Sequence, residues 1–192
     1  MLYGAVKHGV LAVGYERQTS GPFTPQEVVH ELAELAATKE IFKLTPDTAR
    51  QRLSKLVKLE DGATPEFHQA APDKQYLVGA NPASGIQWIG LQFQENDSDK
   101  GKTYWNLPSA QFALSREEGD SDQLYKEVKT ILAARLAKLG RLKTDTFDNG
   151  FSWRLGAHRE VCIEKGAFDN PIKKRNQRVV MITMAIAEEE PN

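Results

Sequence analysis

Residues 179–186 read VVMITMAI, and this stretch decides the expected fold. Successive side chains of a strand point to opposite faces of a sheet. One face would carry Val179, Met181, Thr183 and Ala185, and the other Val180, Ile182, Met184 and Ile186. Because both faces are apolar, the strand belongs in the middle of a sheet, covered by the chain's own helices or by a second copy in a homodimer.

Other segments have the composition of strands and would build the rest of this sheet. Alternation is clearest at Phe151, Trp153 and Leu155, which share one face of a half-buried strand. The full set of expected strands is 2–15, 76–78, 86–93, 104–105, 110–114, 151–155, 159–164 and 178–187. Turns or loops are expected at 18–22, 79–85 and 95–101, where Gly, Pro, Asn and charged residues gather.

Three segments carry helix signals. Thr24-Pro25-Gln26-Glu27 combines an N-cap, a proline at the first helical position and a capping glutamate, which predicts a helix to about residue 38. Thr45-Pro46-Asp47 repeats the start signal. A third helix begins near Asp120 and ends at Gly140. Its expected apolar arc consists of Leu124, Val128, Ile131, Leu132, Leu136 and Leu139.

These elements predict an α+β fold, with a mixed, mostly antiparallel sheet, about three helices packed on it, and the last strand central. A length of 192 residues is expected to form a single domain, residues 1–192. The loop expected at 62–73 marks an internal boundary between a helical N-terminal part and a sheet-rich C-terminal part.

Composition narrows the classes of function. The 25 basic and 26 acidic residues nearly cancel, so no global field attracts nucleic acid or an anionic membrane. The one cysteine, Cys162, excludes an internal disulfide and a CxxC metal motif. No apolar run approaches the length of a membrane span, and the glycine-broken N-terminus is unlike a secretory leader. We therefore expect a cytoplasmic protein with no membrane partner.

Motifs for catalysis or cofactors are weak. Gly101-Lys102-Thr103 lacks the first glycine of a phosphate loop and precedes a strand instead of a helix. His158, Glu160, Cys162 and Glu164 alternate along one expected strand, and a metal or acid/base site there would need a further ligand such as Asp169. A solvated strand face is the simpler interpretation, so we predict no catalytic residue, no metal and no cofactor.

A DNA-binding alternative comes from the helical part, residues 24–60. The stretch from Leu44 to Leu53 loosely resembles the recognition helix of winged-helix DNA-binding proteins. That resemblance implies contacts to DNA from Arg50, Gln51, Arg52, Lys55 and Lys58. The connection from Thr38 to Leu44 is longer than the usual helix-turn-helix turn, which favours an ordinary amphipathic helix with a basic face.

The leading hypothesis is a non-enzymatic domain that binds another protein, such as an immunity or inhibitor protein that neutralises a toxin or effector. One candidate surface is the basic cluster Lys173, Lys174 and Arg175 before the last strand, with Arg178 close by. A second is acidic and aromatic, and would meet a basic partner. Its residues are Trp105, Glu117, Glu118 and Asp120, with the acidic connection that begins at Glu95.

Overall fold

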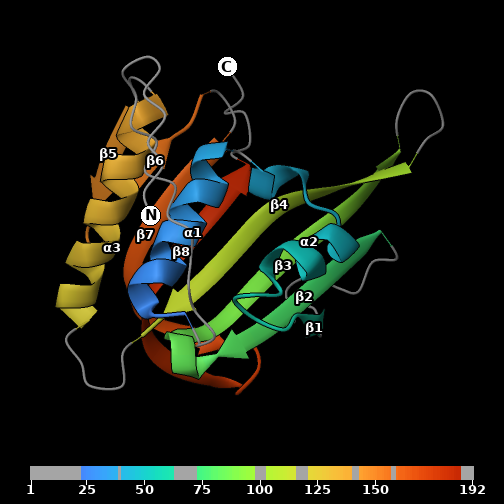
Figure 1. Cartoon of the computed structure of the whole chain (residues 1–192), viewed down its shortest axis with the longest axis horizontal. Helices are drawn as coiled ribbons and strands as arrows, with labels where there is room; N and C mark the ends of the chain where they lie inside the picture. The colour runs from blue at the N-terminus through green and yellow to red at the C-terminus, as the bar shows by residue number, and fades with distance from the viewer. Residues whose placement is uncertain are drawn as a thin grey trace, which may run out of the picture.

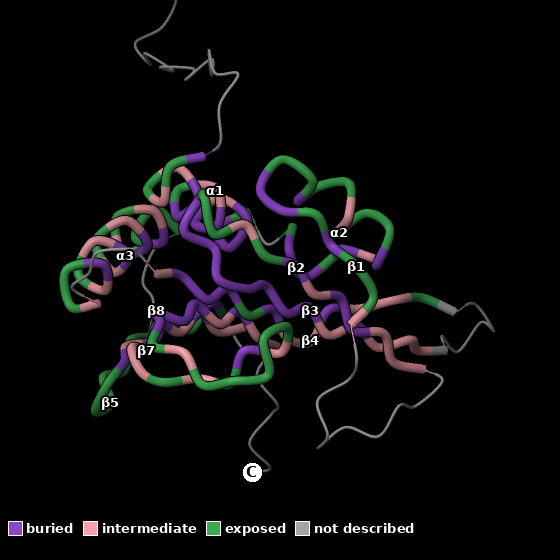
Figure 2. The backbone as a smooth tube through the Cα atoms, turned by 90° about the horizontal axis from the view of Figure 1, so that it is seen from below, coloured by how far each residue is buried: buried purple, intermediate pink, exposed green. Residues whose placement is uncertain are grey.

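The computed structural model describes residues 23–38, 40–62, 73–97, 103–115, 121–139, 143–156 and 159–186. Its frame is an eight-stranded antiparallel sheet. Helices cover one face of this sheet, and Figures 1 and 2 show all three α-helices on that side. The α+β fold expected from the sequence is therefore confirmed, and every described strand pair is antiparallel.

The sheet consists of two meanders that meet in its centre. The strands are β1 (Glu60–Asp61), β2 (Lys74–Asn81), β3 (Ile86–Asp97), β4 (Thr103–Leu114), β5 (Lys143–Phe147), β6 (Gly150–Arg154), β7 (Arg159–Asn170) and β8 (Arg175–Ile186). Their order across the sheet is β1-β2-β3-β4-β8-β7-β6-β5. The last strand, β8, thus lies between β4 and β7, as its two apolar faces predict.

The helices begin where the sequence signals place them. They are α1 (Pro25–Thr38), α2 (Pro46–Leu53) and α3 (Ser121–Leu136), with the short 3-10 helices η1 (Glu40–Lys43), η2 (Pro82–Ser84) and η3 (Ala137–Leu139). The Thr24 amide donates to Glu27 Oε2 at 2.7 Å, and the Glu27 amide donates to Thr24 Oγ1 at 3.3 Å. Thr45 caps α2 in the same way, with Thr48 in the position of the glutamate.

The main core lies between the helices and the sheet. Leu32 of α1, Leu132 of α3 and Ile182 of β8 are all fully buried in it, together with residues of both meanders. A smaller apolar cluster lies on the opposite, open face of the sheet. It consists of Trp88, Ala113, Val179 and Met181, against which Phe168 packs. On that open face of β8, Val179 and Met181 are buried within this chain, while Thr183 and Ala185 remain half-exposed.

Several expected boundaries were wrong. The strand expected at 159–164 continues to Asn170, and the last strand begins at Arg175 instead of residue 178. The expected loop at 79–85 shrinks to η2 and Gly85, because β2 runs to Asn81. The segments expected at 104–105 and 110–114 are one strand, β4. Between these two segments lies Pro108, which has no amide hydrogen. The described pairing of β4 with β8 starts at the next residue, Ser109, so the proline costs no hydrogen bond to β8.

Two further corrections concern α3 and β5. Leu139 does not belong to the buried arc of α3, because η3 turns it out to 42% exposure. No strand was expected at β5, whose five residues are all exposed. The strand or hairpin expected at 2–15, the turn at 18–22 and most of the loop at 62–73 lie outside the described residues.

The outer strands of the sheet are short or capped. β1 has two residues. In β5, Phe147 pairs with Gly150 across a two-residue turn, so the alternation of an antiparallel ladder directs the Thr146 amide away from β6. That amide donates instead to the Asp145 carboxylate at 2.8 Å. None of the described helices has the length and apolar character needed to cross a bilayer.

Candidate binding surface

The turn that joins β7 to β8 is organised by one buried side chain. Asn170 is 1% exposed, and its Oδ1 accepts hydrogen bonds from the amides of Ile172 and Lys173, both at 2.9 Å. Its backbone carbonyl accepts a third, from the Lys174 amide at 2.8 Å. Lys174 itself has a left-handed φ of 49°, which closes the turn. The four-residue turn 171–174 is therefore fixed from the inside.

The same asparagine ties the hairpin to the underside of the sheet. Asn170 Nδ2 donates to Gln177 Oε1 at 3.0 Å, and Gln177 Nε2 donates to Gln87 Oε1 at 2.6 Å. Gln87 lies at a register shift of β3 and is only 8% exposed. Because β4 ends at Leu114, opposite Val180, the hairpin beyond that pair has no strand beside it. Figure 1 shows this part as the red ribbon that curls at the lower end of the sheet.

An apolar contact strengthens the same attachment. Phe168 of the curled part of β7 packs on the cluster that contains Trp88 and Val179, each 1% exposed. Full burial of a phenylalanine side chain contributes about 1.5 to 3 kcal/mol, and the half-buried Phe168 contributes a part of that. The hairpin is thus held under the start of β3 by both packing and a relay of amide side chains.

Four exposed cations and one exposed apolar side chain lie on this platform. Lys173, Lys174, Arg175 and Arg178 are all exposed, and Ile172 beside them is 44% exposed. Over residues 169–178, four cations less the one carboxylate give a formal charge of +3. Among the described residues, none of these cations has a carboxylate within ion-pair distance. We call residues 170–178 the basic tip.

The basic tip corrects one expectation about its setting. The sequence placed Lys173, Lys174 and Arg175 in a connection, whereas Arg175 is the first residue of β8. What sequence reasoning missed was the platform, namely Phe168, Asn170 and Gln177. The Asn170-Pro171 pair is a turn signal that could have located the hairpin end. Nothing in the local pattern pointed to Gln87.

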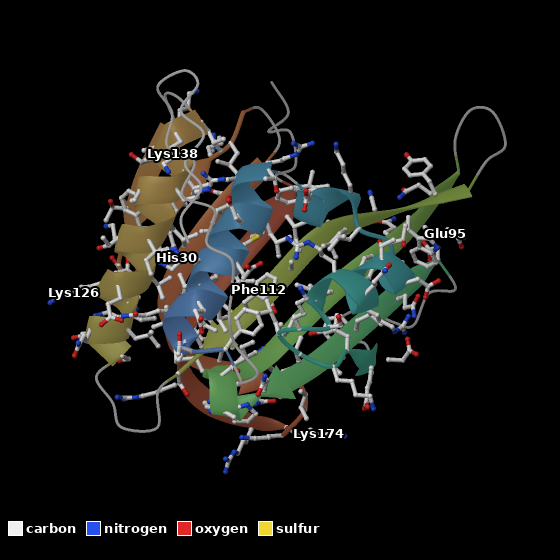
Figure 3. All side chains as sticks on the ribbon, viewed as in Figure 1. His30, Glu95, Phe112, Lys126, Lys138 and Lys174 are labelled. Atoms are coloured by element: carbon white, nitrogen blue, oxygen red, sulfur yellow. The ribbon has the colours of Figure 1, made fainter. Side chains whose placement is uncertain are left out.

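The acidic and aromatic surface is only partly visible. Trp105 is half-buried and packs against the main core, so the more exposed aromatic of β4 is Tyr104, at 52%. Glu95 lies opposite Trp105 near the far end of β3. Figure 3 shows Glu95 there, while Lys174 lies by the start of that strand. Glu117, Glu118 and Asp120 lie outside the described residues.

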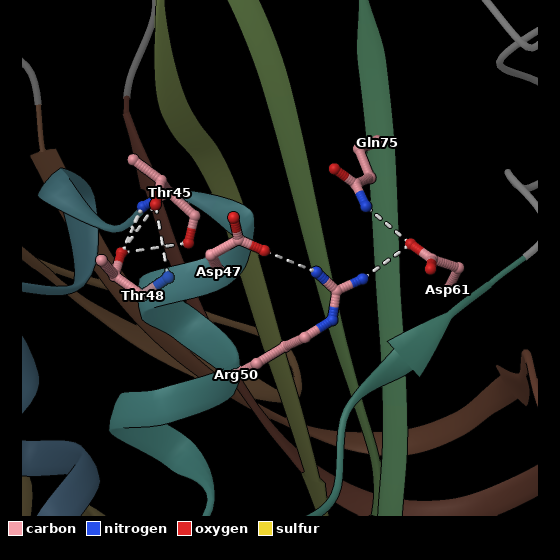
Figure 4. A network of polar contacts seen from close by, with 6 residues as sticks. All are labelled: Thr45, Asp47, Thr48, Arg50, Asp61 and Gln75. Carbon is pink, nitrogen blue, oxygen red and sulfur yellow. Dashed lines mark hydrogen bonds and ion pairs between the residues drawn. The ribbon is translucent and has the colours of Figure 1, made fainter.

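The basic face of α2 is neutralised by neighbouring carboxylates. Arg50 bridges Asp47 at 3.3 Å and Asp61 of β1 at 2.8 Å. Gln75 of β2 donates to the same Asp61 oxygen at 2.6 Å. Figure 4 shows how this network spans from the helix to the first two strands. Arg50 therefore serves to hold α2 over the sheet.

Two other cations of the DNA-binding alternative are also engaged. Arg52 lies 3.8 Å from Glu31 and 3.6 Å from Glu40, which links α2 to α1 and η1. Lys58 pairs with Glu60 at 2.6 Å, and this contact raises the pKa of Lys58 and lowers that of Glu60. The remaining candidates of that surface, both exposed, are Gln51 and Lys55.

The strand face with the cysteine does not form a reactive thiol. Burial, helped by the Glu160 and Glu164 carboxylates on the same face, raises the pKa of Cys162 to about 12. The thiol stays protonated near neutral pH, whereas a nucleophile or a metal ligand must be a thiolate. In the described part of the chain, no group of three His, Cys, Asp or Glu side chains is placed to hold a metal ion. His158 lies outside it.

A groove between α1 and α3 also went unnoticed in the sequence. It is open to solvent, encloses about 390 Å³, and is lined by Gln26, His30, Lys126, Glu127, Thr130 and Ile131. Figure 3 labels His30 on α1 and Lys126 on α3. Arg135 of α3 pairs with Glu34 of α1 along the same helix pair. These residues belong to the outer surface of the helical layer, and their arrangement favours no particular ligand.

Comparison of the chain with models of known protein families, with curated proteins and with solved structures finds no match.

Proposed function

We propose that this chain is a non-enzymatic domain that binds another protein, with the basic tip as its recognition element. The observation that carries the proposal is the fixed turn at Asn170, which presents Ile172 beside cations that pair with no carboxylate of the described residues. A rigid recognition loop loses little conformational entropy on binding. Arginine beside an exposed apolar anchor is also the composition typical of binding hot spots.

The proposal extends to an immunity or inhibitor role, in which a toxin or effector is neutralised when the tip covers its working surface. A hairpin end that is held from behind by Gln87 and Trp88 keeps its shape when it meets a partner. The competing proposal is DNA binding through α2. Ion pairs at Arg50, Arg52 and Lys58 leave that helix with little free positive charge, so the tip is the better-supported surface.

Affinity capture with matched charge reversals tests this proposal. The full chain, immobilised, is compared with a triple tip variant, Lys173→Glu, Lys174→Glu and Arg175→Glu. The control changes net charge equally at three exposed lysines of α3, η3 and β5, namely Lys126→Glu, Lys138→Glu and Lys143→Glu. We expect the tip variant to lose a captured protein at least tenfold and the control to retain it. Equal capture by all three proteins would remove the tip from the proposal.

A DNA-binding measurement tests the competing proposal. Fluorescence anisotropy of a labelled duplex is measured with the wild-type chain across a range of salt concentrations, and then with Arg52→Ala plus Lys55→Ala. We expect no salt-sensitive binding, because the formal charge of the chain is -1 and Arg52 is paired. Tight binding with a steep salt dependence, abolished by the double variant, would replace protein binding by DNA binding.

A further inference from the structure

Resting on the proposed function, we infer that the basic tip recognises a carboxylate-rich protein surface with an apolar socket for Ile172, and not a phosphate group. The first reason is the use of the backbone amides. Successive amides in a turn commonly form a concave nest that binds phosphate. In this turn the amides of Ile172, Lys173 and Lys174 all donate inward to Asn170. An anion at the tip can therefore be held only by side chains.

The second reason is the way in which those side chains are distributed. Lys173 and Lys174 lie in the turn, and Arg175 and Arg178 follow on β8, so the cations are spread along the hairpin. Dispersed carboxylates on a protein surface match such a spread better than one compact anion does. Each lysine and arginine offers charge-assisted hydrogen bonds to a carboxylate. Association would then depend on salt concentration, since the cations are exposed.

The third reason is Ile172, which lies between Pro171 and Lys173 in the turn. Its side chain is 44% exposed, although it is apolar and branched. Apolar side chains at the centre of an interface become buried while charged ones form the rim. A phosphate backbone offers no apolar site for such a residue, whereas a protein surface can. The partner that fits is therefore acidic around its edge and apolar in its middle.

The test titrates the full chain, labelled with ¹⁵N, and follows the backbone amides of residues 168–178. The probes are a short peptide in which leucine is flanked on both sides by glutamates, the same peptide with serine in place of leucine, inorganic phosphate and a duplex DNA. We expect the leucine peptide to shift the tip amides, with an affinity that falls as salt is added. The serine peptide should bind roughly tenfold more weakly, because it cannot fill the contact with Ile172.

An Ile172→Ser variant gives a second readout. It should bind the leucine and serine peptides equally, while Tyr104→Ser, at an exposed aromatic of the other long hairpin, should leave the tenfold preference intact. Shifts of the tip amides by phosphate or duplex DNA at lower concentration than by the leucine peptide would overturn the inference. The inference would also be overturned if the leucine peptide, at millimolar concentration, shifted none of the tip amides. If affinity capture depends on the tip but the leucine peptide shifts no tip amide, the proposal that the chain binds a protein stands. Only the inference that the partner is acidic is then wrong.

Discussion

The two long hairpins of this sheet, β3–β4 and β7–β8, occupy equivalent positions in its topology, but their ends take different directions. Each is the last hairpin of its meander, and the antiparallel pairing of β4 with β8 makes them leave the centre at opposite ends. Figure 1 shows β3–β4 extending away from the sheet while β7–β8 curls back beneath it. Topology alone therefore does not determine where a hairpin end lies.

The difference comes from the side chains that face the open side of the sheet. On the curled hairpin these include Phe168 and Gln177, which meet Trp88 and Gln87 of β3. On the extended hairpin, Gln94 remains half-exposed and Tyr104 is 52% exposed. A few apolar and amide contacts are enough to convert a protruding ribbon into a fixed platform. Three experiments can break or sharpen this comparison.

The largest effect is expected at Trp88. Replacing this fully buried side chain in Trp88→Ala removes the anchor of Phe168 and should lower the free energy of unfolding by about 3 to 5 kcal/mol. Tyr104→Ala, in the extended hairpin, should change it by less than about 0.5 kcal/mol. Urea unfolding followed by circular dichroism measures both. Similar losses at the two positions would mean that the hairpins are anchored alike.

A smaller effect is expected at Asn170. Asn170→Ala leaves the amides of Ile172 and Lys173 without their acceptor and removes the donor to Gln177, so about 1 to 3 kcal/mol of stability should be lost. Hydrogen exchange of the amides of residues 172–174 should accelerate as well. The matched control is Asn176→Ala, an exposed asparagine of the same hairpin. Unchanged hydrogen exchange in Asn170→Ala would show that another contact fixes the turn.

The smallest effect is a pH dependence that arises from Cys162 of the second meander, the chain's one cysteine. The folded thiol of Cys162 has a pKa of about 12, above its ordinary value of 9.0, because of burial and Glu160. The unfolded chain therefore releases this proton first as pH rises, and stability falls between those two values by up to about 1.4 kcal/mol per pH unit. Urea unfolding near pH 8 and near pH 10 compares wild type with Cys162→Ala. Equal pH slopes in the two proteins would contradict the buried thiol.

Local patterns in the sequence predicted a large part of this fold. Thr24 and Thr45 mark helix starts through their own hydrogen bonds, and the two apolar faces of residues 179–186 specify a central strand. Such signals are local, since capping and alternation depend on neighbours within a few positions. The cations of the tip were recognisable as a candidate for the same reason.

The remaining features depend on contacts between distant segments. Gln87 and Gln177 are 90 residues apart, so nothing near either of them indicates the curl of β7–β8. Likewise, the cations of α2 form a favourable DNA-binding pattern in sequence, and only the fold brings Asp61 to Arg50. β5 escaped notice because its exposed residues lack the apolar alternation of a half-buried strand.

The capped amide of Thr146 has a consequence for how copies of this protein behave when crowded. An unprotected outer strand invites another chain to extend the ladder, which is a common route to fibres. Here the Asp145 carboxylate accepts the hydrogen bond of that amide and adds a negative charge at this edge of the sheet. At the opposite edge, β1 has only two residues and is too short to pair stably with a strand of another chain. Concentrated solutions of this protein should therefore resist aggregation through pairing of edge strands.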